Sequence, residues 1–174
     1  SLDSATAPLD ALIDDIRTRC GATILPPKGK ALMLVRELRK GRVIGMVVDQ
    51  RGRRRDGLSC AVFGMNAPTN PAPAFIAIKG RALVLPVHAV KESGRYRIVV
   101  DEAVDAAAFG DSPEGVQALS SRMQSWVCSV VRDHPDQWFW LHSRWVKKKT
   151  FRRYLASGGD FRTFVETVNG QAVL

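Results

Sequence analysis

The residues best placed to carry chemistry follow the apolar run 43–48, where Asp49 and Gln50 interrupt it. Four arginines come next: Arg51, Arg53, Arg54 and Arg55. In open α/β sheets, ligands bind at the carboxyl ends of strands, so a buried strand ending at Val48 would place Asp49 in a site. Guanidinium groups bind phosphates through paired hydrogen bonds. The segment therefore predicts either a polar site with phosphate-binding arginines or a strand cap followed by a solvated loop.

The second candidate segment is residues 135–147, which combines aromatic and basic side chains. Three tryptophans stand beside a histidine and an arginine, and lysines follow: Trp138, Trp140, His142, Arg144, Trp145 and Lys147 to Lys149. Such a cluster can fill a core, lie at a membrane interface or stack on nucleic-acid bases. The sequence alone leaves these three roles open.

Several common classes of site are excluded. The chain has no Gly-x-Ser-x-Gly elbow, Walker loop, dinucleotide fingerprint or HExxH motif. We expect His88 and His134 to be structural, because neither is followed by an acid at the spacing of a proton relay. The three cysteines are far apart, without a CxxC pair, so we expect free thiols and neither a metal ion nor a cofactor.

Composition limits the partners. The chain has 174 residues and is 45% hydrophobic, which suits one folded domain. Its formal net charge of +9 favours an anionic partner: a phospholipid, a phosphorylated glycolipid, an acidic carrier protein or a nucleic acid. The uncharged stretch 57–78 holds three prolines and two asparagines, so it does not predict a lipid-embedded helix. The N-terminus shows no signal-peptide pattern, and we expect any membrane anchor to lie outside this chain.

Periodicity predicts the elements that position these segments. Helices are expected from Leu9 to Cys20, over 31–38, from about 69–71 to Gly80, and from Ser112 to a stop before 133–135. Extended segments are expected at 22–25, 43–48 and 58–63, and a hairpin should join 83–90 to a half-buried strand bearing Tyr96, Ile98 and Val100. Strands alternating with helices predict an α/β fold, a mixed sheet flanked by helices.

Five blocks, in order along the chain, carry a resemblance to a known family. They are Pro8-Leu9-Asp10 with Arg17 and Gly21; Leu38-Arg39-Lys40-Gly41 through Val48-Asp49-Gln50; Phe63-Gly64 with Ala67-Pro68-Thr69; Gly80-Arg81-Ala82 through Leu85-Pro86-Val87; and His134-Pro135-Asp136-Gln137-Trp138 through Arg144-Trp145. Together these blocks resemble the late acyltransferases of lipid A biosynthesis, the lauroyl and myristoyl transferases. The sequence departs from that pattern at Ala7, Arg81, Ser143 and Val146.

The resemblance implies transfer of a fatty acyl chain, from acyl carrier protein or acyl-CoA, to a lipid A precursor or a related phosphorylated lipid. It implies a glycerolipid-acyltransferase-like fold, peripheral attachment at the cytoplasmic face of the inner membrane, and no nucleic-acid partner. The residues that it places in substrate binding come from three of the blocks and the arginine run. They are Asp49, Gln50, Arg53, Arg54, Arg55, Phe63, Gly64, Thr69, His142 and Arg144.

The family's His-x4-acid motif, whose histidine acts as general base, has no match here. The residues at that spacing after the three histidines are Ser93, Phe139 and Lys147. We therefore expect a domain truncated at the N-terminus, with a partial acyltransferase domain over 1–150 and a basic tail over 151–174, and no turnover by this chain alone. The alternatives are a non-catalytic acyltransferase-like binding domain and a basic nucleic-acid-binding module.

Overall fold

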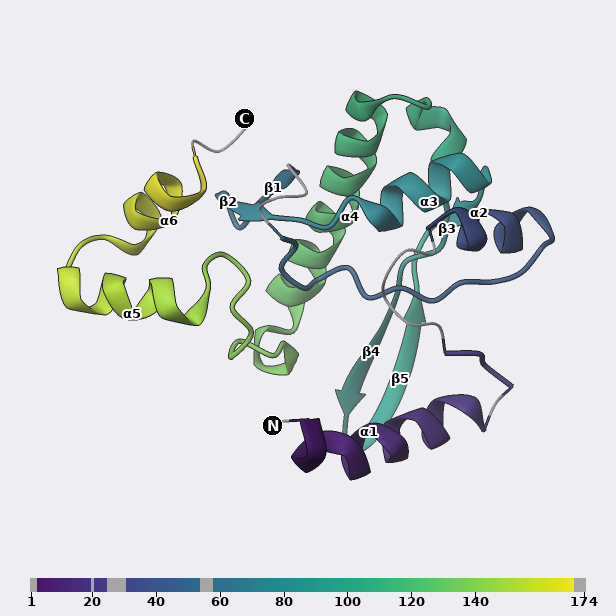
Figure 1. Ribbon diagram of the computed structural model, residues 1–174, viewed down its shortest axis with the longest axis horizontal. Helices are drawn as coiled ribbons and strands as arrows, with labels where there is room; N and C mark the ends of the chain where they lie inside the picture. Colours follow the sequence, from purple (N-terminus) through teal and green to yellow (C-terminus); the bar gives the residue numbers. More distant parts are fainter. Residues whose placement is uncertain (1–2, 20, 25–30, 54–57, 171–174) are drawn as a thin grey trace. The chain divides into compact units, whose positions relative to one another are not determined.

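The structure is a computed structural model that describes residues 3–19, 21–24, 31–53 and 58–170 (Figure 1). The chain divides into two compact units, 1–30 and 31–174. In the first unit, helix α1 (Asp3–Thr18) confirms the predicted amphipathic helix. It is followed by Gly21 at φ +78°, whose N–H bonds to the Thr18 carbonyl. The strand predicted over 22–25 is wrong for residues 22–24, which form no ladder, and Leu25 lies outside the described residues.

The second unit contains the other helices and all the strands of the described residues. The helices are α2 (Ala31–Arg39), α3 (Ala72–Gly80), α4 (Pro113–Asp133), α5 (Lys148–Ser157) and α6 (Phe161–Asn169), with short 3-10 turns η2 (Ala106–Phe109) and η3 (Pro135–Gln137). The strands are β1 (Ser59–Val62), β2 (Met65–Pro68), β3 (Leu83–Val84), β4 (Val87–Glu92), β5 (Arg95–Val100) and β6 (Val104–Asp105). No helix of the described residues has the length and apolarity needed to cross a membrane.

The strands form three separate antiparallel pairs in the described part of the chain: β1 with β2, β3 with β6, and β4 with β5. The α/β content was predicted correctly, but the single mixed sheet was not. The reason is local: tight turns join β1 to β2 and β4 to β5, so these four strands pair with their neighbours in sequence, whereas the two-residue strands β3 and β6 pair across the β4–β5 hairpin. The expected half-burial of β5 is also wrong, since Tyr96 is 73% and Ile98 63% exposed while Val90, on the other face of the hairpin, is 1% exposed.

The run 43–48 was predicted to be a strand buried on both faces, and this prediction is wrong. The run forms no strand within the described residues, and Val43 and Val47 are exposed. Apolar composition alone does not supply a hydrogen-bonded neighbour, which a strand requires. Its end is instead held by a side chain of α4, because Gln124 Nε2 donates to the Val48 carbonyl at 2.8 Å.

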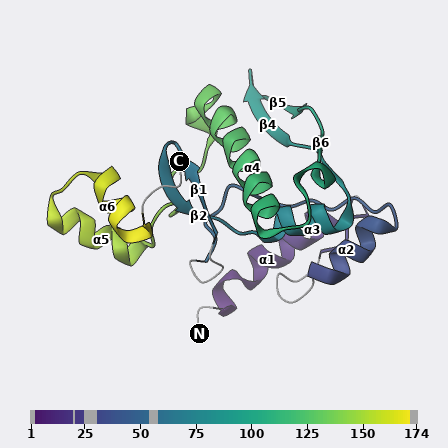
Figure 2. The same cartoon turned by 90° about the horizontal axis from the view of Figure 1, so that it is seen from above.

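Helix α4 is the central element of the second unit (Figures 1 and 2). Ser112 caps its first turn by accepting from the Gly115 N–H, and the helix stops at the predicted position before Pro135. Near its start, Leu119 packs with Ala77 and Ile78 of α3. Near its end, Cys128 packs with the β1–β2 hairpin. Between these two contacts, Ser120, Met123 and Gln124 line a cavity together with Gln50 and Arg51.

Candidate functional site

The two segments that sequence reasoning selected meet in the structure. Trp138 Nε1 donates a 3.1 Å hydrogen bond to Asp49 Oδ2, although the two residues are 89 positions apart. The other carboxylate oxygen of Asp49 is buried and has no hydrogen-bond partner among the described residues. A buried carboxylate oxygen without a donor is costly, so this atom calls for a ligand or an ordered water as its partner.

Arg144 is buried at the centre of this junction, with only 1% of its surface exposed. Its guanidinium donates to the Pro68 carbonyl at 2.6 Å and to Thr69 Oγ1 and Gln124 Oε1 at 2.9 Å. Because Gln124 also holds the Val48 carbonyl, one network joins the end of β2, helix α4 and the residue before Asp49. Arg144 thus positions the surrounding segments, and its direct contact with substrate stays a prediction.

The charge of Arg144 persists in this buried position. Burial lowers the pKa of Arg144 to about 10, and the negative charge of Asp49 opposes that shift. The guanidinium therefore remains protonated at neutral pH. A buried cation is tolerated only when it is hydrogen-bonded or paired, which explains the three protein acceptors around it.

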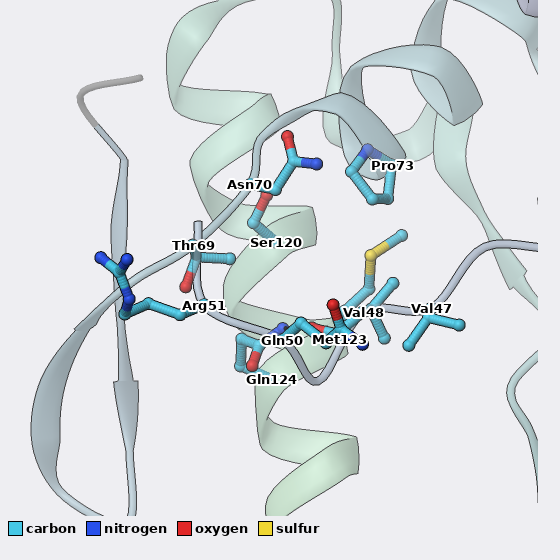
Figure 3. Close-up of a pocket in the computed structure, with 10 residues that line it drawn as sticks. All are labelled: Val47, Val48, Gln50, Arg51, Thr69, Asn70, Pro73, Ser120, Met123 and Gln124. Atoms are coloured by element: carbon cyan, nitrogen blue, oxygen red, sulfur yellow. Dashed lines mark hydrogen bonds between the residues drawn. The ribbon is translucent and has the colours of Figure 1, made fainter. Parts of the chain in front are cut away.

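A cavity of about 130 Å³ lies beside this network (Figure 3). Its lining comes from the segment after residue 46, the β2–α3 connection, the first turn of α3, and α4. The lining residues are Val47, Val48, Gln50, Arg51, Thr69, Asn70, Pro73, Ser120, Met123 and Gln124. Two of the predicted binding residues, Gln50 and Thr69, are thus brought together, while Asp49 lies beside the cavity in its bond to Trp138.

A second cavity, of about 200 Å³, shares Arg51 with the first. Its other lining residues come from the start of α5 and from α6 and their approaches: Trp145, Val146, Lys147, Thr150, Val168 and Asn169. Arg51 and Lys147 are the two cations of this lining. The second cavity therefore has the charge expected of a site for an anionic group.

The tryptophans contact one another but do not fill a core, because Trp138 and Trp145 are half-buried and Trp140 is 52% exposed. The ring centroid of Trp138 lies 4.7 Å from that of Trp140 and 6.3 Å from that of Trp145, and Phe63 lies 6.3 Å from Trp140. Phe63 and Gly64 form the left-handed turn between β1 and β2, with φ of 51° and 72°. Phe63 also packs against Trp138, which donates to Asp49.

Other predicted site residues are not gathered at the cavity. Arg53 is exposed, whereas Arg54 and Arg55 lie outside the described residues. His142 is half-buried, with a buried Nδ1 that has no hydrogen-bond partner among the described residues. The binding roles of these residues stay predictions.

His88 lies elsewhere, in a contact that the sequence did not suggest. Its Nδ1 is 3.5 Å from Asp101 Oδ2, and its ring packs edge-on against Trp126, whose Nε1 donates to the same carboxylate at 2.7 Å. The three side chains fasten β4 and the end of β5 to α4, which is a structural arrangement.

Sequence reasoning missed Ser120 and Gln124, both buried on α4. Their spacing of four residues was the available signal, because it places two polar side chains on one helical face next to the apolar stripe. Polar residues beside such a stripe are common at helix borders, so burial could not be inferred from the pattern alone.

Comparison with known proteins identifies the class as that of lipid acyltransferases. Residues 3–147 match the family described as bacterial lipid A biosynthesis acyltransferase, and this range includes Asp49, Ser120 and Arg144. The chain belongs to this family, which confirms the predicted resemblance.

The chain is also similar to phosphatidylinositol mannoside acyltransferases from two strains of Mycobacterium tuberculosis, CDC 1551 and H37Rv. The identity is 28% over 136 residues in each case, covering 76% of this chain. The match covers 41% of each relative, so the chain spans about two-fifths of their length.

Proposed function

We propose that this chain forms the acceptor-binding part of an enzyme that transfers a fatty acyl group to a hydroxyl of a phosphorylated glycolipid. The observation that carries the proposal is the convergence of the family-like blocks on one site, through the bond from Trp138 to Asp49 and the network of Arg144. The family acts in lipid A biosynthesis, and the mycobacterial relatives are named for a phosphatidylinositol mannoside. Both acceptors combine sugar hydroxyls with phosphate.

The charges of the chain support an anionic acceptor and a charged surface. Arg51 and Lys147 line the second cavity, and the side chains of Lys147, Lys148, Lys149, Arg152 and Arg153 are exposed at the start of α5. We name these five residues the basic arm. Such a surface suits lipid phosphates, an acidic acyl carrier protein as donor, and attachment to the cytoplasmic face of the inner membrane.

The general base belongs, in this proposal, to polypeptide outside these 174 residues. None of the three histidines is followed at the family's spacing by an acid. General acid–base catalysis contributes about 10²–10⁴-fold, so this chain alone should show no measurable turnover. Its contribution is to bind the acceptor and to present it to the base.

The test is an acyl-transfer assay with a longer polypeptide that carries this chain together with a His-x4-acid motif. Acyl carrier protein and acyl-CoA donors should each be offered with a lipid A precursor and with phosphatidylinositol mannoside. Transfer to at least one of these acceptors, abolished by His→Ala in the motif, supports the proposal. Turnover by the 174 residues alone at a comparable rate would contradict the assignment of the base.

A second candidate function is a binding domain that retains the acyltransferase scaffold without catalysis, since a fold does not by itself imply activity. The family blocks that converge on Asp49 and Arg144 are all that such a domain would need. This candidate predicts that the acceptor lipid binds with unchanged affinity whether or not an acyl donor is present, and that no longer polypeptide carrying the chain transfers acyl groups.

A further inference from the structure

The hydroxyl of Ser120 is an unexplained polar group in the 130 Å³ cavity. Ser120 is 2% exposed, and its Oγ has no hydrogen-bond partner among the described residues. Ser120 also lines the cavity, from the middle of α4 (Figure 3). Buried hydroxyls are normally hydrogen-bonded, and an exception calls for a ligand or an ordered water as its partner.

The cavity offers neutral hydrogen-bonding groups. Besides Ser120, it has the amides of Gln50 and Asn70; the Asn70 side-chain oxygen accepts from the Ala72 N–H, and no described residue accepts from its nitrogen. Gln124 and Thr69 line it too, but both are already bonded to Arg144. These groups suit hydroxyl or amide partners better than ions.

The apolar residues of the lining and its single cation, Arg51, also bear on which ligand the cavity suits. Pro73 and Met123 give the cavity apolar surface, and its described lining includes no acidic side chain. Figure 3 shows the Arg51 guanidinium directed away from Ser120 and Met123. The space beside Ser120 is therefore lined by neutral polar groups and by apolar groups. A sugar ring presents the matching surfaces, because it carries hydroxyls at its edge and C–H groups on its faces.

The volume limits the occupant to one small group. A single buried water needs about 10–15 Å³, so about 130 Å³ holds more than one water. Pockets that enclose whole drug-sized ligands occupy about 300–1,000 Å³. This volume therefore points to one small group, such as a single ring, in preference to a whole fatty acyl chain or pantetheine arm.

We propose that this cavity is a subsite for a neutral sugar ring, in which the Ser120 hydroxyl exchanges a hydrogen bond with a ring hydroxyl. The assignment of that ring to the acceptor glycolipid rests on the proposed function. The binding of a sugar ring at Ser120 does not rest on the proposed function. It is inferred from the burial of Ser120, from the lack of a described hydrogen-bond partner for its hydroxyl, and from the residues that line the cavity.

The test is a titration of the 174-residue chain followed by ¹H–¹⁵N NMR. Methyl α-D-mannopyranoside and N-acetyl-D-glucosamine are the sugar probes, and inorganic phosphate and pantetheine are the comparison ligands. The expected result is a saturable shift of the amide signals of Ser120, Gln50 and Asn70 with at least one sugar. No shift of these signals with either sugar at the highest soluble concentration would overturn the subsite and leave an ordered water as the partner of Ser120.

The matched variants are Ser120→Ala and Ser129→Ala, both on α4. Ser129 is exposed, and its Oγ donates to the Trp126 carbonyl. Ser120→Ala should weaken sugar binding about fivefold, the size of one neutral hydrogen bond, and should raise the melting temperature because a buried hydroxyl without a partner is removed. Ser129→Ala should leave sugar binding unchanged. Equal sugar affinity in the wild-type chain and Ser120→Ala would overturn the proposal.

The comparison ligands separate other occupants from a sugar. If phosphate rather than sugar shifts the Ser120 signal, the cavity is an anion site; if only pantetheine does, it belongs to the donor, and either result overturns the subsite. Failure of the proposed function is a different result. Sugar binding that depends on Ser120, combined with no acyl transfer by any longer polypeptide, would keep the subsite and remove only its assignment to an acyl acceptor.

Discussion

The indole of Trp138 donates to one oxygen of Asp49 while the other oxygen of the same carboxylate is buried without a partner among the described residues. The two oxygens of this carboxylate therefore have different roles. The bond from Trp138 needs only an acceptor oxygen, which the amide of an asparagine also supplies. Action of the other oxygen on a substrate would need the negative charge of the carboxylate.

Replacing Asp49 separates these two roles. In an active longer polypeptide carrying this chain, Asp49→Asn should lower kcat/KM by about tenfold or more, equivalent to about 1.4 kcal/mol in the transition state. The melting temperature should change little, because the Asn oxygen still accepts from Trp138. Trp138→Phe is the control: it removes the donor and keeps an aromatic ring, so it should lower stability more than Asp49→Asn does. Parallel losses of activity and stability in Asp49→Asn would indicate a structural carboxylate.

Arg144 should be essential to stability. Arg144→Met removes three hydrogen bonds from a charged donor and leaves Gln124 Oε1 without a described donor, whereas the Pro68 carbonyl still accepts from the Gly52 N–H and the Thr69 hydroxyl still donates to the Ala67 carbonyl. A hydrogen bond to a charged group contributes about 1.5–3 kcal/mol and a buried unsatisfied acceptor costs about 1–3 kcal/mol, so the free energy of unfolding should fall by about 3 kcal/mol. Urea denaturation measures this loss. Arg153→Met, at an exposed position of α5, should change it by less than about 0.5 kcal/mol. A loss as small as that for Arg144→Met would show that the network does not hold the site.

Gly52 should tolerate no side chain. A Cβ at this position would lie 2.4 Å from the Thr69 carbonyl carbon and 2.6 Å from the Asn70 nitrogen, and both atoms are backbone. Gly52→Ala should therefore destabilise the protein by about 1–3 kcal/mol and disturb the first cavity. Gly45→Ala is the matched control, because no atom lies within 4 Å of its Cβ and its φ is not positive. It should be neutral or slightly stabilising in thermal unfolding. Equal melting temperatures for the two variants would contradict the close approach at residue 52.

The basic arm should bind the chain to anionic membranes. Vesicle sedimentation should show binding to vesicles with phosphatidylglycerol and weak binding to neutral ones. Replacing the five residues of the arm by Gln should lower this binding by about tenfold or more, since Lys and Arg near an anionic surface each contribute. Salt should have a similar effect, because the Debye length is about 10 Å at 0.1 M.

The control for the arm removes the same charge elsewhere. It replaces Arg17, Arg81, Arg95, Arg122 and Arg132, all exposed, by Gln. If this variant loses as much vesicle binding as the arm variant, net charge rather than the arm is responsible. If wild-type binding is equal for neutral and anionic vesicles, the electrostatic docking proposal is wrong.

The sequence by itself determined the elements whose signals are local. Helix α4 begins at a Ser-Pro cap and ends before a proline, and the turn at 93–94 specifies the β4–β5 hairpin. The family was also predicted from the sequence, because the order and composition of its five blocks identify it without knowledge of any contact in the structure. The acyltransferase class therefore required no tertiary structure.

Only the tertiary structure decided which of these local pieces meet. An apolar run such as 43–48 is compatible both with a buried strand and with an exposed extended segment. Which of the two forms depends on whether a neighbouring strand is present to pair with it. Likewise, the resemblance placed Arg144 in substrate binding, and only the structure shows that Arg144 is buried among three acceptors distant in sequence. Ser120 acquires its chemical interest in the same way, because the lack of a partner for a hydroxyl is a property of its surroundings and not of its position in the chain.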